Sequence, residues 1–597
     1  MHRGALRRSE GDRVDSWAMA ALLCLASLPA GPARAQPPAH AYRLEARLDA
    51  ETHRVEGRAL IRWTNGSDAP IDALLWHLYL NAFADRGTIF MRETGGSLRG
   101  ERFSGPGSIE VHELRLESGE DLLEGADFEL EPGDRTQLRT PLPRPIAPGQ
   151  SVQIEARFTS ILPPLFARSG HAMGLHVVAQ WFPKLARLEP DGRWADFPYA
   201  AHTEFYADFA RYELSLDLPS GWPVGATGDL VSDREQGDRH LVEFRADPVH
   251  DAAFVTAPWL LERVAVRGEL RLRILYPPGY GRAAGHHEAI ALRALSSFES
   301  LYGPYPYRTL TIIVPPRAAR GGAAMEYPML LLTSGPWFRV PGVRFVHEDV
   351  TVHELAHQWF QGMIASDEAR WPMLDEGLAT WAAMDHLRQV HGRDASGVGL
   401  GPIRLDSFEL LRLFALRPGD PAPLSAARSF SRGASYGRSV YGRSALTLES
   451  VARTWGRDRL HQALGRYARR HRFGHPEPAD LFESFDAIYG PGFSARVLEP
   501  SLAEGALAEL SLQAGSPPSR GSALGLPTWI RCDETLTPWP AGQAPPPSPS
   551  PRCERTLNPH RSNLLDPVAL DETETRGRGF LELAMGLLQL LAGSIGP

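Results

Sequence analysis

The sequence predicts a multidomain α+β protein in which an N-terminal antiparallel β domain precedes a mainly helical half. A chain of 597 residues is long enough for several domains. From about residue 41 to residue 262, apolar and polar side chains alternate in short segments separated by Gly, Pro and Asp, as in half-buried strands. Helical runs then continue to about residue 490. We therefore expect a β domain at 36–262, a second domain at 263–500 and a tail at 501–597.

Residues 1–35 have the pattern of an export signal. Several arginines precede an apolar run at 17–28, and Ala33-Arg34-Ala35 forms a small-x-small cleavage site. We therefore expect an exported protein, either periplasmic or secreted. The net charge of −8 and a pI near 6.2 argue against a nucleic-acid partner. The sequence does not indicate an oligomeric state.

The β domain is expected first along the chain. Its alternation is clearest at 42–48, 55–63, 152–158 and 212–218. The second half is expected to open with a strand at 309–314 and an extended apolar edge at 323–332. A largely buried helix at 350–363 follows, and then helical runs at 376–387 and 445–454.

The helix at 350–363 contains His353-Glu354-Leu355-Ala356-His357, and Glu376 follows after an eighteen-residue gap. Histidines four residues apart project from one helix face, so two imidazole nitrogens can reach a single Zn²⁺. Glu376, from the next helix, would add a third ligand and leave one tetrahedral position for water, as in catalytic zinc sites. Glu354 lies beside the first ligand and is the candidate general base.

The alternative is a surface helix whose histidines and carboxylates are solvated. The apolar residues of this helix argue against it, because they predict burial, and buried histidines and carboxylates need partners that a metal can supply. They lie at positions 352, 355, 356, 359, 360 and 363.

The eighteen-residue gap between HExxH and the glutamate resembles the M1 zinc aminopeptidases of the gluzincin class, whereas thermolysin-like endopeptidases have a gap one residue longer. Residues 322–328 resemble the G-x-M-E-N exopeptidase motif of that family, and 440–445 resemble its Y-x-K-G segment. The match covers roughly residues 40–495. It implies a saddle of strands, a thermolysin-like catalytic domain and a cleft between them.

The resemblance also implies an activity, the removal of N-terminal residues from peptides. Glu354 would take a proton from the attacking water and later deliver it to the leaving amine. Tyr441 would donate a hydrogen bond to the oxyanion, with Tyr436 as the rival candidate. Glu326 would bind the free α-ammonium, and the edge at 323–332 could pair with the substrate as an added strand. Gln180, within 179–183, resembles a second amine-binding position.

Several positions depart from the family pattern, which indicates a distant branch. They are Ala323 and Tyr327 in the exopeptidase motif, Asp375 before the third ligand, and Gly442-Arg443-Ser444 after Tyr441. These departures concern substrate positioning and leave the zinc ligands and the base in place. A zinc endopeptidase of relaxed end-specificity is therefore an alternative, and a non-catalytic scaffold of the same fold is a second.

The tail carries three expectations. A Pro- and Ser-rich stretch at 538–551 is expected to be a linker, and Cys532 and Cys553 form the even pair that remains after signal removal, so a disulfide is plausible. The run at 580–595 predicts an amphipathic helix that docks on the protein or contacts a membrane peripherally. The tail is much shorter than the helical domain of classical family members, so we also expect a more open cleft.

Overall fold

The computed structural model describes most of residues 40–503 and three short strands beyond them. The described residues are 1, 40–98, 100–128, 133–338, 345–392, 398–400, 403–405, 407–415, 419–503, 528–532, 535–539 and 553–556. The predicted signal at 1–35 and the predicted helix at 580–595 lie outside this part of the chain, apart from Met1. No helix in the described part is both long enough and apolar enough to cross a bilayer.

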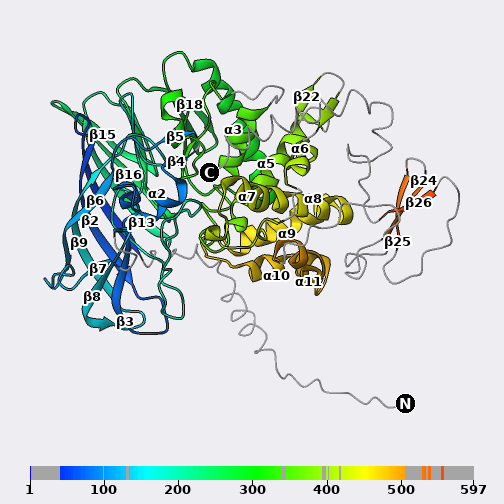
Figure 1. The fold of residues 1–597 in the computed structure, drawn as a ribbon, viewed down its shortest axis with the longest axis horizontal. Coiled ribbons are helices and arrows are strands. Elements are labelled where there is room, and N and C mark those ends of the chain that lie inside the picture. Colours follow the sequence, from blue (N-terminus) through cyan, green and yellow to red (C-terminus); the bar gives the residue numbers. More distant parts are fainter. Residues whose placement is uncertain are drawn as a thin grey trace. The chain divides into compact units, whose positions relative to one another are not determined.

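A seven-stranded sheet dominates the N-terminal half, and the four predicted alternating segments all lie in it. In the order β15-β16-β13-β1-β2-β9-β6, its strands are Asp229–Gln236, Arg239–Val249, Ala210–Pro219, Ala41–Asp49, Arg54–Thr64, Ser151–Ile161 and Ser108–Leu116 (Figure 1). Alternate side chains are buried, as predicted, because one face packs on the core. The β domain is not purely antiparallel, however, since β1 pairs with β13 in parallel.

The β-rich half also contains two four-stranded sheets and the short pair β4 (Ser97–Leu98) and β5 (Glu101–Arg102). One has the order β12-β3-β8-β7, with strands Lys184–Leu185, Ile71–His77, Gln137–Ile146 and Asp127–Phe128. The other has the order β10-β11-β17-β14, with strands Gly170–Ala172, Leu175–Val178, Phe254–Thr256 and Val224–Ala226. Many of their side chains join the large sheet in one hydrophobic core.

The second half opens with a mixed sheet in the order β18-β19-β20-β21. Its strands are Leu261–Arg267, Leu270–Tyr276, Thr309–Ile313 and Leu330–Leu332. Since β18 begins at Leu261, this sheet starts two residues before the expected domain boundary. β20 confirms the predicted strand at 309–314, but the edge predicted at 323–332 is a strand only over its last three residues. Positive φ angles at Ala324 and Met329 bend the chain, and Met325 exchanges backbone hydrogen bonds with Leu332.

Helices form a second core in this half, and they run from green to orange in Figure 1. The main ones are α3 (Gly281–Tyr302), α4 (Val346–Ala356), α5 (Glu376–His391), α8 (Ser444–Trp455), α9 (Arg457–Arg470) and α10 (Pro478–Tyr489). The helix predicted at 350–363 begins earlier and ends at Ala356, so His357 is its C-cap. His357 keeps right-handed helical dihedrals, with φ −61° and ψ −19°, and its N–H donates to the His353 carbonyl at 3.3 Å.

Three strands lie in the described part of the tail, namely β24 (Thr528–Cys532), β25 (Thr535–Trp539) and β26 (Cys553–Thr556). β25 includes Pro538, so the expected linker begins inside a strand. In the antiparallel register of β24 and β26, Cys532 lies opposite Cys553.

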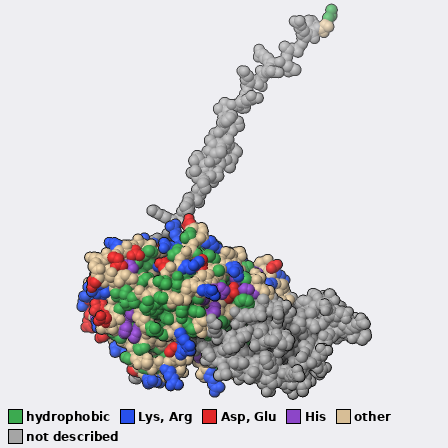
Figure 2. All heavy atoms as spheres, turned by 90° about the horizontal axis from the view of Figure 1, so that it is seen from above, with side chains coloured by type: hydrophobic (Ala, Val, Ile, Leu, Met, Phe, Trp, Pro, Cys, Tyr) green, Lys and Arg blue, Asp and Glu red, His purple; other side chains and the backbone are tan. Residues whose placement is uncertain are grey.

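On the face shown in Figure 2, basic and acidic side chains are interspersed.

A candidate zinc centre

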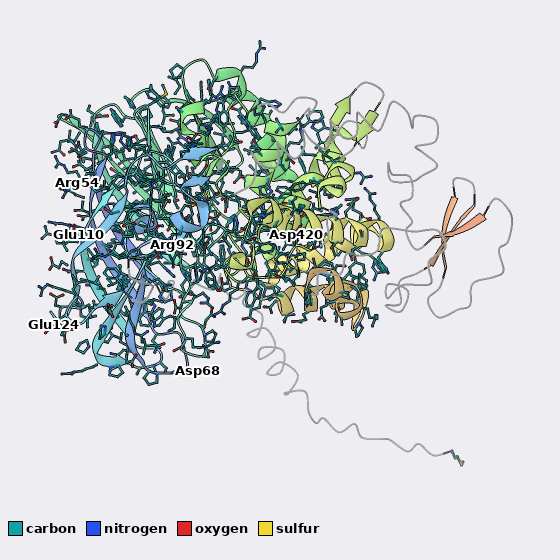
Figure 3. The ribbon with its side chains drawn as sticks, in the orientation of Figure 1. Arg54, Asp68, Arg92, Glu110, Glu124 and Asp420 are labelled. Carbon is teal, nitrogen blue, oxygen red and sulfur yellow. The ribbon has the colours of Figure 1, made fainter. Side chains whose placement is uncertain are left out.

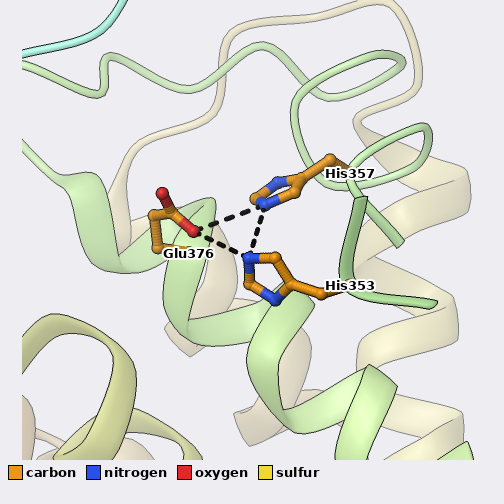
Figure 4. Close-up of side chains that lie close together, drawn as sticks. All are labelled: His353, His357 and Glu376. Atoms are coloured by element: carbon orange, nitrogen blue, oxygen red, sulfur yellow. Dashed lines mark hydrogen bonds and ion pairs between the residues drawn. The ribbon is translucent and has the colours of Figure 1, made fainter. Parts of the chain in front are cut away.

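The three predicted zinc ligands converge in the structure (Figure 4). Nε2 of His353 lies 3.0 Å from Nε2 of His357, and Oε2 of Glu376 lies 3.1 Å and 3.3 Å from these two nitrogens. A tetrahedral zinc ion with bonds of 2.0–2.1 Å would hold such atoms roughly 3.3 Å apart. Two imidazole nitrogens and one carboxylate oxygen also match the donor set of catalytic zinc sites, so these residues fit the metal.

Local helix structure creates this triangle. α4 supplies His353 from its last turn and His357 at its C-cap, while Glu376 is the first residue of α5. Gly377 lets α5 approach closely, because a Cβ added there would lie 2.6 Å from Cβ of Ser444 and 3.1 Å from the Val440 carbonyl oxygen. Gly377 therefore permits the close packing of α5 on α8 and on the turn before it.

Asp375 orients the second ligand. Its Oδ1 forms a short hydrogen bond with Nδ1 of His357, which also lies 3.2 Å from the Phe360 carbonyl oxygen. With Nδ1 of His357 donating to Asp375, Nε2 of the neutral ring would present its lone pair to a metal, as in carboxylate–histidine–zinc arrangements. Burial would lower the pKa of His357, but Asp375 and Glu326 raise it well above its usual value.

The site gathers more carboxyl groups than its histidines can pair with. Ligand atoms of Glu326, His357 and Asp375 lie within 4.8 Å of one another. Glu368 is 2% exposed, and burial together with the charges of Asp375, Glu326 and Glu376 raises its pKa well above the usual value. A divalent cation among these carboxylates would relieve their mutual repulsion.

Glu354 and Tyr441 both belong to this site region. Glu354 follows His353 in α4 and is 3% exposed. The Tyr441 hydroxyl donates a short hydrogen bond to Oε1 of Glu376, and its ring stacks on His353 with centroids 5.9 Å apart. The rival Tyr436 is fully buried and stacks on His202 at 4.9 Å. The geometry therefore favours Tyr441 over Tyr436.

Glu326 is buried near the zinc ligands, and a neighbouring arginine was not identified in the sequence. Arg168, which follows β9, forms a short ion pair with Glu204, and its Nη1 lies 3.2 Å from Sδ of Met325 and 3.4 Å from the Ala324 carbonyl oxygen. Burial would lower the pKa of Arg168, but Tyr199 and Glu326 are among the groups that raise it. No sequence motif marks Arg168 or Glu204, because the fold alone brings Arg168 to Glu204 and to the segment of Glu326.

Gln180 lies in a different network. Its amide nitrogen donates a short hydrogen bond to Asp251, and its Oε1 accepts one from Nζ of Lys184 at 2.9 Å. Lys184 also pairs with Asp251 at 2.6 Å, and all three side chains are buried. Among the described contacts, those of Gln180 lie with Lys184 and Asp251. Its predicted amine-binding role stays a prediction.

Comparison with known proteins agrees with this geometry. Residues 289–497 match the peptidase family M1 domain. Aminopeptidase 2 of Candida albicans is 25% identical over 227 residues, which are 37% of this chain and 24% of the relative. Aminopeptidase N of Lactobacillus delbrueckii subsp. lactis is 25% identical over 209 residues, which are 33% of this chain and 24% of the relative. The chain thus spans about a quarter of the length of these relatives.

Solved structures share the fold. An M1 zinc metallopeptidase from Deinococcus radiodurans superposes with a TM-score of 0.51 at 18% identity, covering 81% of this chain and 96% of that one. Aminopeptidase A of Legionella pneumophila, in complex with aspartic acid, gives a TM-score of 0.54 at 16% identity and covers 78% of this chain and 49% of that one. The expected order of a β-rich half before a mainly helical half is confirmed.

Proposed function

We propose, from the match of residues 289–497 to the peptidase family M1 domain, that this chain is a zinc-dependent aminopeptidase that hydrolyses N-terminal residues from peptides. The observation that carries the proposal is the convergence of His353, His357 and Glu376 beside Tyr441 and the buried Glu326. One zinc ion would be held by the two imidazoles and the Glu376 carboxylate. When bound, it would polarise the scissile carbonyl and acidify a water molecule.

The protein's own groups would move the proton. Glu354, next to a ligand on α4, would accept the proton of the attacking water and pass it to the leaving amine. Its burial supports this role, because a carboxylate with little water around it is a stronger general base. Asp375 would keep His357 in the tautomer that presents Nε2 to the metal.

Tyr441 would stabilise the developing oxyanion. Its hydroxyl lies within hydrogen-bonding reach of a ligand oxygen of Glu376, so a small rotation would aim it at a carbonyl held beside the metal. A phenol donor placed where negative charge develops contributes about 3 kcal/mol in comparable oxyanion sites.

Glu326 would select substrates with a free amine. A buried carboxylate gains a full charge partner from an unblocked α-ammonium, and a blocked peptide does not offer that partner. Its motif continues with Tyr327, whose hydroxyl donates to the Arg168 carbonyl oxygen at 3.3 Å. Glu326 thus sits on a segment fixed to the β-rich half.

The second candidate is a zinc endopeptidase of relaxed end-specificity, and the charge of Arg168 favours it. A buried guanidinium that interacts with Glu326 would offset part of the attraction for an ammonium. The two candidates differ in how far kcat/KM falls when the substrate's N-terminus is blocked.

An activity assay on an unblocked aminoacyl anilide and its N-acetylated form would separate the two candidates. An aminopeptidase should prefer the unblocked form by at least about a hundredfold in kcat/KM, whereas equal rates would reject it in favour of the endopeptidase.

Activity should disappear with a chelator and return with zinc. Glu354→Gln should bind zinc normally and lose at least about a thousandfold in kcat, and retained activity would reject Glu354 as the base.

A further inference from the structure

Residues 420 and 421 contact the helical turn that carries Tyr441. This turn, η5 (Gly437–Arg443), is a π-helix that lies between α7 (Gly433–Tyr436) and α8. π-Helical turns are rare, and their widened backbone must be stabilised by contacts outside the turn. Residues 420 and 421 provide such contacts, and Figure 3 labels Asp420 among the helices of this half.

Asp420 is the centre of these contacts. Its carboxylate accepts hydrogen bonds from Oγ of Ser435 at 2.6 Å and from Nε and Nη2 of Arg438 at 2.7 Å and 2.8 Å. Nη2 of Arg443 lies 3.7 Å away, and the Pro421 carbonyl accepts a hydrogen bond from Ser439 at 2.5 Å. The contacts therefore join residues 420 and 421 to η5 on both sides of Tyr441.

The charges make this arrangement firm. The side chains of Asp420 and Arg438 are 10% and 15% exposed, so solvent screens their bidentate pair only partly. Burial would raise the pKa of Asp420, but hydrogen bonds from Arg438 and Ser435 lower it below the usual value. Asp420 therefore stays ionised. Without its charge, the guanidinium groups of Arg438 and Arg443 would face each other unbalanced.

Tyr441 depends on the position of this turn. Its hydroxyl reaches Glu376 and its ring stacks on His353, so a shift of η5 would move the phenol relative to the metal ligands. Gly442, the next residue, packs so closely on α6 (Ser407–Ala415) that an added Cβ would lie 2.7 Å from Cβ of Ala415. The turn is thus held by packing on one side and by the Asp420 contacts on the other.

We propose that Asp420 is a positioning residue that holds η5, through Arg438 and Ser435, so that Tyr441 points at the reacting carbonyl. This inference rests on the proposed function, because it concerns the oxyanion donor of that reaction. A misplaced donor weakens interactions made in the transition state more than those made with the bound substrate. Asp420→Asn should therefore lower kcat about tenfold or more and change KM less than about twofold.

A double-mutant cycle tests whether Asp420 acts through Tyr441. Asp420→Asn should lower kcat by a much smaller factor in a Tyr441→Phe background than in the wild type, because the hydroxyl that Asp420 positions is already gone. If Asp420→Asn lowers kcat by the same factor in both backgrounds, and Tyr441→Phe alone also lowers kcat, this inference is overturned and the proposed function stays intact. A Tyr441→Phe enzyme as active as the wild type would overturn both the inference and the oxyanion role.

A readout without catalysis completes the test. Hydrogen exchange of the metal-free protein should be faster in Asp420→Asn over residues 433–443, and unchanged exchange there would overturn the inference. Asp217→Asn is the matched control, since Asp217 accepts a hydrogen bond from Arg239 in the β-rich half and should alter neither kcat nor this exchange. If Asp420→Asn does not fold, Arg438→Gln takes its place in the cycle with the same expected results.

Discussion

At the scale of single residues, the candidate zinc centre includes Asp375, which is not one of its three proposed ligands. Asp375 is fully buried and accepts the Nδ1 hydrogen of His357. We predict that Asp375→Asn weakens zinc binding about 10- to 100-fold, because an amide orients the imidazole less firmly and gives it less negative charge. Competition with a chromophoric chelator would measure the dissociation constant.

The control for this prediction is a buried aspartate away from the site. Asp134 accepts hydrogen bonds from the backbone of Ile89 and Thr136 in the β-rich half. Asp134→Asn should reduce stability without changing zinc affinity. Equal zinc affinities for Asp375→Asn and the wild type would contradict the orienting role of Asp375.

The convergence of His353, His357 and Glu376 was predictable because its geometry is local. Two histidines four residues apart on a helix and a glutamate opening the next helix need only helix periodicity. Arg168 and Glu204 were not predictable, since Arg168 meets Ala324 across 156 residues of sequence and belongs to the other half of the protein. Long-range contacts of this kind depend on how the two halves pack, which no local pattern encodes.

At the scale of elements, the contact between α5 and α8 sets the distance from Glu376 to Tyr441. We predict that Gly377→Ala lowers the free energy of unfolding by about 1–3 kcal/mol and also reduces kcat. The added methyl would meet Ser444 at 2.6 Å and push α8, together with η5, away from α5. Denaturant unfolding and steady-state kinetics would measure the two effects.

The matched control is Gly66→Ala, because a Cβ at Gly66 would meet no atom within 4 Å. Neither its stability nor its kcat should fall as in Gly377→Ala. A Gly377→Ala protein as stable and active as the wild type would show that α5 and α8 do not need this close contact.

Strand pairing in the tail supports a disulfide between Cys532 and Cys553. These residues lie opposite each other in the antiparallel pair β24–β26, where facing Cα atoms are about 4.5–5.5 Å apart, within the span of a disulfide. We predict that protein exported from its host lacks two hydrogens in intact mass relative to reduced protein. A peptide map without reductant should contain the linked pair, and two free thiols in exported protein would contradict the prediction.

Element boundaries were harder to predict than element types. The zinc-ligand helix was expected to run to 363 and ends at Ala356, because apolar residues beyond it are buried in a turn rather than in further helix. The edge at 323–332 has strand-like composition but folds back on itself through Met325 and Leu332. Apolar composition predicts burial in both cases and does not fix the backbone path.

At the scale of the whole molecule, the change from period two to helical runs correctly predicted the order of the two halves. The parallel pairing of β1 with β13 was not predictable, because the two strands lie about 170 residues apart and no local pattern fixes which strands pair. Met325, Tyr327 and Leu330 pack into the core of the β-rich half, although the sheet that includes Leu330 belongs to the second half. Glu326 lies in this shared segment, so the two halves should unfold together.

Two buried histidines, one in each half, can test this cooperativity through pH. Burial lowers the pKa of His77 in β3 and of His287 in α3 to about 3, from 6.5 in an exposed chain. Above about pH 6.5 both states are neutral. Below about pH 6.5 the unfolded chain binds protons that the folded protein excludes, so stability decreases as the pH is lowered from about 6.5 to about 3.

We predict that each histidine removes about 2 kcal/mol of stability between about pH 7.5 and about pH 5. His77→Phe keeps the stacking with Tyr79, and His287→Gln keeps a partner for Thr351, so each should reduce the pH dependence by that amount. Denaturant unfolding at the two pH values measures the difference. If the halves unfold as one unit, there is a single unfolding transition, and both variants should reduce its pH dependence. Two transitions, with the pH dependence of each reduced by one variant only, would contradict joint unfolding.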